Sequence, residues 1–341
     1  MRSIVRTLRS DIRSRMNIPI DLVSDRLSKA SRILIVSHVD PDGDAIGTQL
    51  AFGRYLRDMG KVVFMVRDSE IPAKYMFLPK VDTIVSAKSL TEDPAIDTAL
   101  VLECPTLSRA GSATRFFKDN TTIVSIDHHK DSTDFGQVNW IDATASSVGE
   151  MAYEYFVHEG YDIPATIATQ LYTAILTDTG RFRYSCTSPR TMTIAGDLIA
   201  RGADPRTICD YVYYDLPPST MLLTGKVLSS LEYYNDGTVC LLTLTNDMLA
   251  EASADPSESD GLVDFTLFTK GVTTGILLKE VDSSHTRVSL RSSDEIDVAR
   301  IAASFGGGGH KNAAGCELPL PLGAAKQRII EILQEAGDQS D

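Results

Sequence analysis

The sequence predicts an α/β protein with three parts: a domain built on a parallel sheet with flanking helices, a helical linker, and a smaller α+β domain. Early in the chain, short apolar runs alternate with helical patterns, which is typical of βαβ units and a parallel sheet. Later, strand-like runs follow one another across a polar turn at 281–286. The 341 residues suit two domains. We place the first at 1–195, the linker at 196–232 and the second at 233–341.

The elements of the first domain are expected in the following order. Ile4, Leu8, Ile12 and Met16 recur every fourth residue, which favours a packed amphipathic helix over a transit peptide in this Arg-rich segment. A helix is also expected at 44–60, with a glycine at its end. The expected strands cover 32–36, 62–66, 98–102 and 122–126, and the later helices cover 146–159 and 164–177.

The rest of the chain predicts a connector and a second core. Residues 188–232 have a helical pattern and connect the two domains. The strands expected beyond them cover 238–245, 271–281 and 286–293, and the helices cover 260–269, 296–304 and 322–336.

Charge and cysteine content exclude several classes of protein. The net charge is −13 and the pI is about 4.9, which argues against binding long nucleic acid, because that needs a basic surface. No apolar window approaches the length of a transmembrane helix, so no membrane partner is expected. The five cysteines are scattered and odd in number, so neither a disulfide framework nor a zinc ribbon is indicated. A cytoplasmic location fits this pattern.

Polar side chains follow the predicted strands where each strand ends. SHVDPDGD at 37–44 follows the first strand, Glu103 follows the strand at 98–102, and DHH at 127–129 follows the strand at 122–126. Asp178 ends a predicted helix. Because the carboxyl ends of parallel strands meet at one edge of a sheet, we expect these side chains to converge there.

Crowded carboxylates indicate a metal centre, because their mutual repulsion is unfavourable without a cation among them. We take six residues as candidate ligands: His38, Asp42, Asp44, Glu103, His128 and Asp178. Their four carboxylates balance two divalent cations. Oxygen-rich ligation favours Mn²⁺, with Mg²⁺ or Co²⁺ as substitutes, over Zn²⁺. Two ions about 3.5–4 Å apart can share a hydroxide and clamp an in-line displacement at phosphorus.

The individual residues also have simpler interpretations. DPDGD alone is typical of a turn, and Asp40 fits that interpretation because it points differently from Asp42 and Asp44. His158 and His285 are interpreted as residues of a surface helix and a turn.

The segment GGGGHKNAAG at 306–315 predicts an anion-binding backbone. Successive glycines leave the ordinary backbone regions, and N–H groups free of side chains can hold a phosphate. A hinge is the alternative, whereas a P-loop is excluded because the GxxxxGK[ST] pattern is missing. Arg291 is a candidate phosphate-binding residue or, alternatively, an ion-pair partner of Asp294 or Glu295. The candidate substrate-binding residues are therefore Arg291, Gly306, Gly307, Gly308, Gly309, His310 and Lys311.

Four motifs together resemble the DHH/DHHA1 phosphoesterase family, and within it the nanoRNase and pAp-phosphatase branch. They are HVDPDGDAIG at 38–47, DHH at 127–129, TDTGRF at 177–182 and GGGGHKNAAG at 306–315. The resemblance implies that 1–195 is a DHH domain and 233–341 a DHHA1 domain, with the active site in the cleft between them.

The resemblance also implies roles for single residues. It places His38 and Asp42 on one Mn²⁺ ion, and Asp44, His128 and Asp178 on the other. Glu103 takes the bridging position, where the family usually has aspartate. His129 is implied to hydrogen-bond the scissile phosphate or donate a proton, and Asp127 to orient it. Arg291 and the glycine-rich segment are implied to hold the terminal phosphate or 3′-nucleotide.

The implied activity is Mn²⁺-dependent hydrolysis of short RNA oligonucleotides, with pAp and linear or cyclic dinucleotides as further substrates. One alternative is a pyrophosphatase or short-chain polyphosphatase. Another is a nucleotide-binding sensor whose turnover is impaired at Glu103. A homodimer is compatible with the sequence, which does not predict the oligomeric state.

Overall fold

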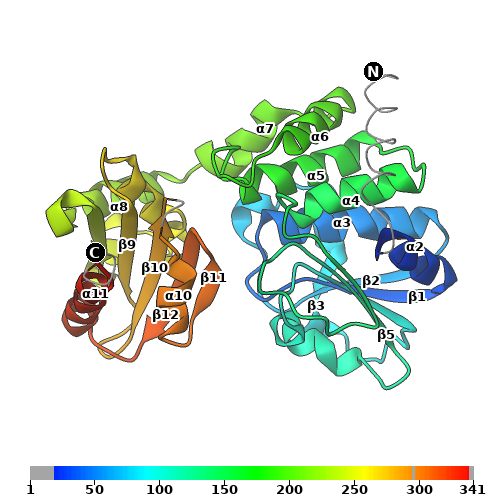
Figure 1. The fold of residues 1–341 in the computed structure, drawn as a ribbon, viewed down its shortest axis with the longest axis horizontal. Coiled ribbons are helices and arrows are strands. Elements are labelled where there is room, and N and C mark those ends of the chain that lie inside the picture. The colour runs from blue at the N-terminus through cyan, green and yellow to red at the C-terminus, as the bar shows by residue number, and fades with distance from the viewer. Residues whose placement is uncertain (1–18, 294–295, 338–341) are drawn as a thin grey trace. The chain divides into compact units, whose positions relative to one another are not determined.

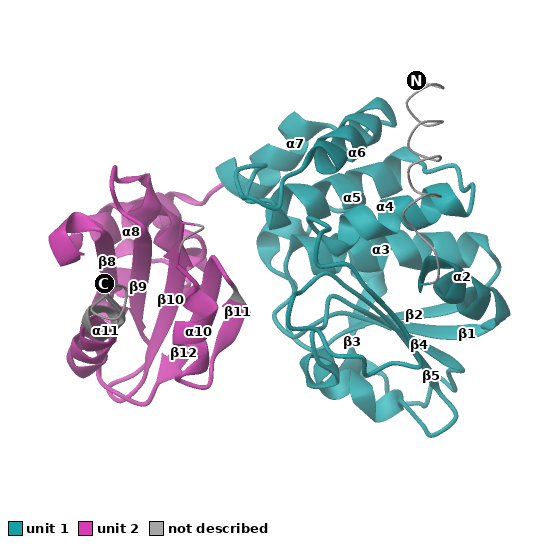
Figure 2. Cartoon of the chain, in the orientation of Figure 1, with its two compact units in different colours: residues 1–215 teal, residues 216–341 magenta. Residues whose placement is uncertain are grey.

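The computed structural model describes residues 19–293 and 296–337 (Figure 1). The helix expected around Ile4 to Met16 lies outside the described residues. The chain divides into two compact units, Met1–Asp215 and Leu216–Asp341 (Figure 2). This division falls inside the range 196–232 that the sequence assigns to a linker. No helix in the described part of the chain is both long and apolar enough to cross a bilayer.

The first unit contains a six-stranded parallel sheet with the order β3-β2-β1-β4-β5-β6. The predicted α/β class is therefore confirmed. The strands are β1 Arg32–Val36, β2 Val62–Arg67, β3 Ile84–Ser86, β4 Thr98–Leu102, β5 Thr122–Asp127 and β6 Val138–Ile141. The order reverses between β1 and β4, where the carboxyl ends of neighbouring strands leave a crevice for ligands. β3 and β6 were not predicted; they are three and four residues long, too short for a clear apolar run.

Helices cover one face of this sheet, and a 3₁₀ segment, η4 Leu107–Phe116, packs on the other (Figure 1). Ile33 and Ile35 of β1 join the core under the helices, whereas Leu34 and Val36 join the core under η4. This alternation follows from the period of two along a strand, and both faces are buried. The helices of the unit are α2 Pro19–Lys29, α3 Gly43–Asp58, α4 Val148–His158, α5 Ala165–Asp178, α6 Pro189–Ala200 and α7 Pro205–Cys209.

The second unit contains a mixed six-stranded sheet with the order β11-β12-β10-β9-β8-β7, in which only the β8–β9 pair is parallel. Its strands are β7 Glu232–Tyr234, β8 Val239–Leu244, β9 Thr274–Glu280, β10 Thr286–Ser292, β11 Gly308–His310 and β12 Ala313–Leu318.

Both faces of the second sheet are covered as well. Helices α10 Val298–Ala303 and α11 Leu322–Gly337 contribute to the core on one face. The core on the other face contains α8 Pro218–Leu228, α9 Asn246–Ala252 and the 3₁₀ helix η8 Leu262–Phe268. The helix expected at 260–269 is thus a 3₁₀ helix, which keeps it short.

Candidate active site

The acidic loop after β1 is shaped by the start of α3. Asp42 is the N-cap residue of this helix, and its Oδ1 accepts a hydrogen bond of 3.0 Å from the backbone N–H of Ala45. Asp44 therefore lies in the first turn, close to the end of β1. Asp40 is exposed and has a φ of 55°, and the N-cap of α3 is Asp42 rather than Asp40. The N–H of Asp40 donates to Ser69 Oγ at 3.1 Å. Asp40 is thus a turn residue.

The side chains that follow β1, β4, β5 and α5 form compact groups. In each group, the ligand atoms lie within 4.8 Å of one another: His38, Asp42 and Glu103 in one, Asp44, His128 and Asp178 in another, and Glu103, His128 and His129 in a third. Glu103 joins the groups: its Oε2 lies 3.6 Å from His38 Nε2 and its Oε1 lies 3.9 Å from His128 Nε2. His128 Nε2 lies 3.3 Å from Asp178 Oδ2.

Glu103 has the properties of a ligand for a cation. It is 1% exposed, and its Oε2 has no hydrogen-bond partner among the described residues. Burial raises the pKa of Glu103 well above 4.5, and the charges of Asp42, Asp44 and Asp178 raise it further. A buried carboxylate of this kind is costly unless a positive charge compensates it. Its backbone has a φ of 55°, a left-handed conformation that is uncommon outside glycine and is often found at functional sites.

Asp178 and Asp44 share this electrostatic environment. Burial raises the pKa of Asp178 well above 3.8, and Asp44 and Asp42 raise it further. Burial also raises the pKa of Asp44, although the charge of His128 opposes this shift. The donor set of carboxylate oxygens and imidazole nitrogens therefore fits hard divalent cations.

Asp44 is held by the N-terminus of α4. The N–H groups of Val148 and Gly149 donate to its two carboxylate oxygens at 2.6 and 2.7 Å, and Thr48 Oγ1 donates at 3.0 Å. A Cβ on Gly149 would lie 2.6 Å from the Cβ of Ala174, so the close approach requires glycine. This contact of α4 with Asp44 was not predicted from the sequence. The Ser-x-x-Glu spacing from Ser147 marks the start of α4, but it does not reveal that α4 contacts Asp44.

Two histidines are oriented by backbone carbonyls. His38 Nδ1 lies 2.7 Å from the carbonyl oxygen of Val39, and His128 Nδ1 lies 3.3 Å from that of Ala145. Because a carbonyl only accepts, both Nδ1 atoms donate, and each neutral ring then carries its lone pair on Nε2. Those are the atoms that face Glu103, as metal-binding imidazoles require.

Asp127 orients His129. The ring Nδ1 of His129 donates to Asp127 Oδ1 at 2.8 Å, and Ser132 Oγ donates to Oδ2. Burial would raise the pKa of Asp127, but the hydrogen bond and charge of His129, the bond from Ser132 and the charge of His128 lower it below 3.8. Asp127 is therefore a carboxylate that fixes the His129 ring. The role of Ser132 was not predicted, because no sequence pattern distinguishes it from other loop serines.

The candidate substrate residues of the second unit share one row of its sheet. Arg291 of β10 pairs with Ala313 of β12, which pairs with His310 of β11. Arg291 forms an ion pair with Asp264, with Nε 2.9 Å from Oδ1. Asp294 and Glu295 lie outside the described residues.

The glycine-rich segment is only partly irregular. Gly306 and Gly309 have φ values of 75° and 141°, whereas Gly307 and Gly308 do not have positive φ. Gly308–His310 forms β11, and Lys311 lies in the turn to β12. The expectation that this segment leaves ordinary backbone space therefore holds at Gly306 and Gly309, whereas Gly308–His310 pairs with β12 as an edge strand.

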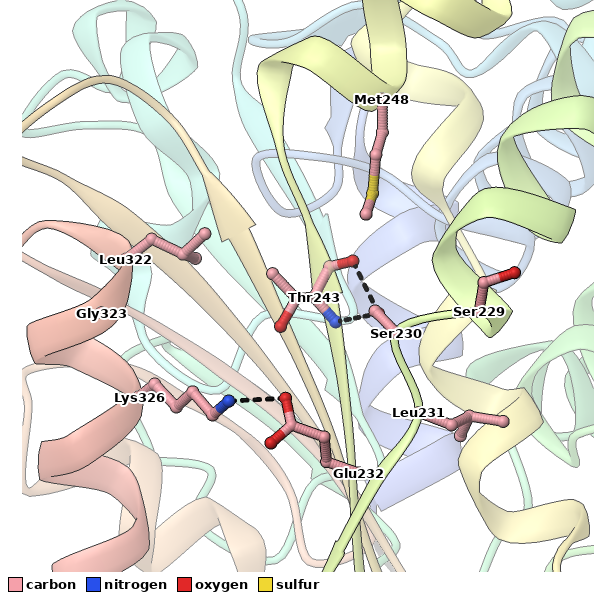
Figure 3. Close-up of a pocket in the computed structure, with 9 residues that line it drawn as sticks. All are labelled: Ser229, Ser230, Leu231, Glu232, Thr243, Met248, Leu322, Gly323 and Lys326. Atoms are coloured by element: carbon pink, nitrogen blue, oxygen red, sulfur yellow. Dashed lines mark hydrogen bonds and ion pairs between the residues drawn. The ribbon is translucent and has the colours of Figure 1, made fainter.

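A separate hollow of about 460 Å³ lies where α8 leads into β7, next to β8 and α11 (Figure 3). Lys326 Nζ donates to Glu232 Oε1 at 2.5 Å, and Ser230 exchanges hydrogen bonds with the backbone of Thr243 (Figure 3). None of the candidate site residues lines this hollow.

The parallel sheet, with carboxylates and imidazoles gathered at its rim, and the appended mixed sheet define an enzyme with a candidate metal centre of the phosphoesterase type. The chain belongs to the DHH family: residues 32–175 match the DHH family, N-terminal domain, and residues 236–338 match the DHHA1 domain. It is a phosphoesterase hydrolase, as the resemblance implied.

Individual relatives agree with this assignment. The chain is 32% identical over 306 residues to the bifunctional oligoribonuclease and PAP phosphatase NrnA of Thermus thermophilus, covering 89% of each chain. It is 26% identical over 298 residues to the protein of the same name from Bacillus subtilis, covering 86% of this chain and 91% of the relative. A crystal structure of an exopolyphosphatase-related protein from Bacteroides fragilis superposes with a TM-score of 0.87 at 30% identity, covering 93% of this chain and 95% of that one.

Proposed function

We propose that this protein hydrolyses short oligoribonucleotides to nucleoside monophosphates and removes a phosphate from pAp. The observation that carries the proposal is the position of Glu103, which is buried, belongs to two of the three groups of ligand atoms, and has one oxygen without a hydrogen-bond partner among the described residues. The names of the Thermus thermophilus and Bacillus subtilis relatives supply the substrate class. The acidic net charge of −13 fits substrates of a few nucleotides better than long RNA.

The proposed ligands of two divalent cations are His38, Asp42, Asp44, Glu103, His128 and Asp178. Bound cations, which we propose to be Mn²⁺, would neutralise the four carboxylates and supply Lewis-acid activation at phosphorus. Glu103 would contribute to both positions, since each of its oxygens faces a different histidine.

In this proposal, the remaining residues bind the substrate phosphate and protonate the leaving oxygen. His129, whose ring is held by Asp127, would donate a proton to the leaving oxygen. The lowered pKa of Asp127 keeps that carboxylate charged, so that it can accept the hydrogen bond from His129. Arg291 and the backbone of residues 306–311 would hold a substrate phosphate.

Product release from an oligonucleotide ladder tests the proposal. With Mn²⁺ supplied, nucleoside monophosphate release should be faster from di- to pentanucleotides than from a 20-mer, and pAp should yield phosphate. A higher rate on the 20-mer than on the dinucleotide would contradict it.

A polyphosphate-directed phosphatase is the second candidate, favoured by the Bacteroides fragilis structure described as exopolyphosphatase-related. Phosphate release from pyrophosphate and tripolyphosphate, measured beside pAp at equal concentrations, separates the two. If phosphate release is faster from pyrophosphate or tripolyphosphate than from pAp, the protein has this second function.

The sensor alternative depends on Glu103 being an impaired ligand. If it were, Glu103→Asp would restore turnover. We expect the opposite, because both oxygens of Glu103 already face a histidine, and a side chain shorter by one methylene reaches less far. Glu103→Gln should lose both turnover and metal binding, which isothermal titration with Mn²⁺ measures.

A further inference from the structure

One cross-strand row of the second sheet extends from Arg291 to the edge strand β7. Arg291 pairs with Gly275 of β9, Gly275 with Cys240 of β8, and Cys240 with Tyr233 of β7. Paired residues on adjacent strands project to the same face of a sheet. Tyr233 and Arg291 therefore lie on one face, three inter-strand spacings or about 14 Å apart.

The 3₁₀ helix η8 lies over the middle of this row. A Cβ on Gly275 would overlap with Thr266 Oγ1, so the glycine allows η8 to contact the sheet. At one end of η8, Asp264 pairs with Arg291. At the other end, Thr269 Oγ1 lies 3.2 Å from the hydroxyl of Tyr233. The helix is thus fixed at both ends of the row.

The outward side of η8 carries two phenylalanines. Three residues per turn align Leu262, Phe265 and Phe268 along η8. Leu262, at the start of this line, is buried, as are Val263 and Thr266. The side chains of Phe265 and Phe268 are 37% and 60% exposed, and their ring centroids lie 5.3 Å apart. Tyr233, beyond Phe268, is 48% exposed. Three exposed aromatic residues therefore follow the arginine along one strip.

We propose that Phe265, Phe268 and Tyr233 form a stacking strip for the nucleobases of a short oligonucleotide whose phosphate lies at Arg291. This inference rests on the proposed function and names the part of the substrate that the second unit recognises. Bases of any identity stack on aromatic rings, and a guanidinium forms forked hydrogen bonds to phosphate. An exposed apolar patch also suits a protein partner, but the cation and the glycine-rich strand in the same row favour an anionic, aromatic ligand.

Fluorescence of metal-free protein tests the strip without turnover. The chain has a single tryptophan, Trp140, which is 4% exposed, so a Trp140→Phe/Phe268→Trp variant carries its only reporter on η8. Titration with pApA and with pAp should quench this fluorescence, and inorganic pyrophosphate, which has no base, should not. Absence of quenching by pApA at any concentration up to the millimolar range would overturn the proposal.

Steady-state kinetics give the second readout. Phe268→Ala should raise KM for pApA about tenfold with kcat changed less than about twofold, because stacking contributes to binding rather than to the chemical step. Phe268→Leu should raise KM for pApA by as much, since it keeps an apolar side chain but removes the aromatic face. Val281→Ala is the control in the same unit: Val281 is 45% exposed on the turn after β9 and should leave KM unchanged.

The outcomes separate this inference from the proposed function. If the wild-type protein hydrolyses no oligonucleotide, the proposed function fails, and the fluorescence titration still decides whether bases stack on η8. If KM is unchanged in Phe268→Ala while sedimentation shows that the variant loses self-association, the strip is an interface between copies of this chain, and the proposal is wrong.

Discussion

The two sheets of this protein place their polar residues in different ways. In the first unit, the candidate ligands lie beyond the ends of β1, β4 and β5, in the first turn of α3 and at the end of α5. In the second unit, the candidate binding residues follow one row across the strands, from the glycine-rich segment at β11 through Arg291 of β10 to Tyr233 of β7, with η8 packed over the row. The first arrangement buries charge, and the second exposes aromatic rings.

This difference determines how tolerant each site is of change. A buried group of carboxylates functions as a unit, so the loss of one ligand unbalances the rest. A strip of exposed rings contributes binding energy residue by residue. We therefore expect substitutions in the first unit to abolish activity, and substitutions in the second to change affinity.

The largest effect is expected for His128→Ala, which removes an imidazole near both Glu103 and Asp178. Hydrolysis should fall by about a thousandfold or more, because Lewis-acid stabilisation contributes several kcal/mol. Measured kcat and the stoichiometry of bound Mn²⁺ check this. His158→Ala, which removes the exposed last residue of α4, near Asp21, should leave both unchanged.

Asp44→Ala should lose activity to the same extent and also lose stability. Its carboxylate accepts hydrogen bonds from Val148 and Gly149, and leaving these buried donors unsatisfied costs about 1–3 kcal/mol each. A thermal melt of Asp44→Ala equal to that of His128→Ala would contradict the role of α4.

The next effect is expected for His129→Ala, with kcat lower by about a hundredfold, the range of general acid catalysis. Mn²⁺ binding should persist, because the proposed ligands remain. Asp127→Asn should reproduce part of this loss, since an amide holds the ring Nδ1 less well than the carboxylate does. Loss of bound Mn²⁺ in His129→Ala would instead make His129 a ligand, which its position near Glu103 and His128 also allows.

The pH dependence of stability should change sign with metal. In metal-free protein, the raised pKa values of Glu103 and Asp178 mean that the folded state keeps protons that the unfolded chain has lost. Their stabilising contribution is complete below the ordinary values of 4.5 and 3.8, and it is lost as the pH rises toward the raised values. The melting temperature in EDTA should therefore fall across this range.

With saturating Mn²⁺ the melting temperature should instead rise with pH, because metal binding requires deprotonated ligands. Glu103→Gln should flatten both curves. Parallel curves in EDTA and Mn²⁺ would show that these carboxylates do not bind the metal.

The grouping of the candidate metal ligands could be predicted from sequence because most of them stand in short motifs directly after apolar strands, and parallel strands end at one rim. The strip could not, because it depends on register. Tyr233 and Arg291 are far apart in the chain, and no periodicity reveals that pairings through Cys240 and Gly275 place them in one row. The ion pair of Arg291 with Asp264 could not be predicted either, because it depends on where η8 packs.

Gly275→Ala tests whether the strip depends on that packing. The added methyl group would overlap with Thr266, so η8 must shift, and we expect a loss of about 1–3 kcal/mol in unfolding free energy. KM for pApA should rise severalfold, because Phe265 and Phe268 move with the helix. Urea denaturation and steady-state kinetics measure the two effects. Gly196→Ala, in a helix where an added Cβ meets no neighbouring atom, is the matched control.

The smallest effect is expected for Lys326→Met, in the hollow beside β7. The ion pair of Lys326 with Glu232 is partly exposed to solvent, and exposed pairs contribute about 0–1 kcal/mol. If catalysis depends only on the rim of the first sheet and substrate affinity only on the row through Arg291, this variant should have unchanged kcat, and its KM for pApA should also match that of the wild type. A KM increase comparable to that of Phe268→Ala would show that binding continues around the edge of β7 into the hollow, and that the strip is longer than the row that defines it.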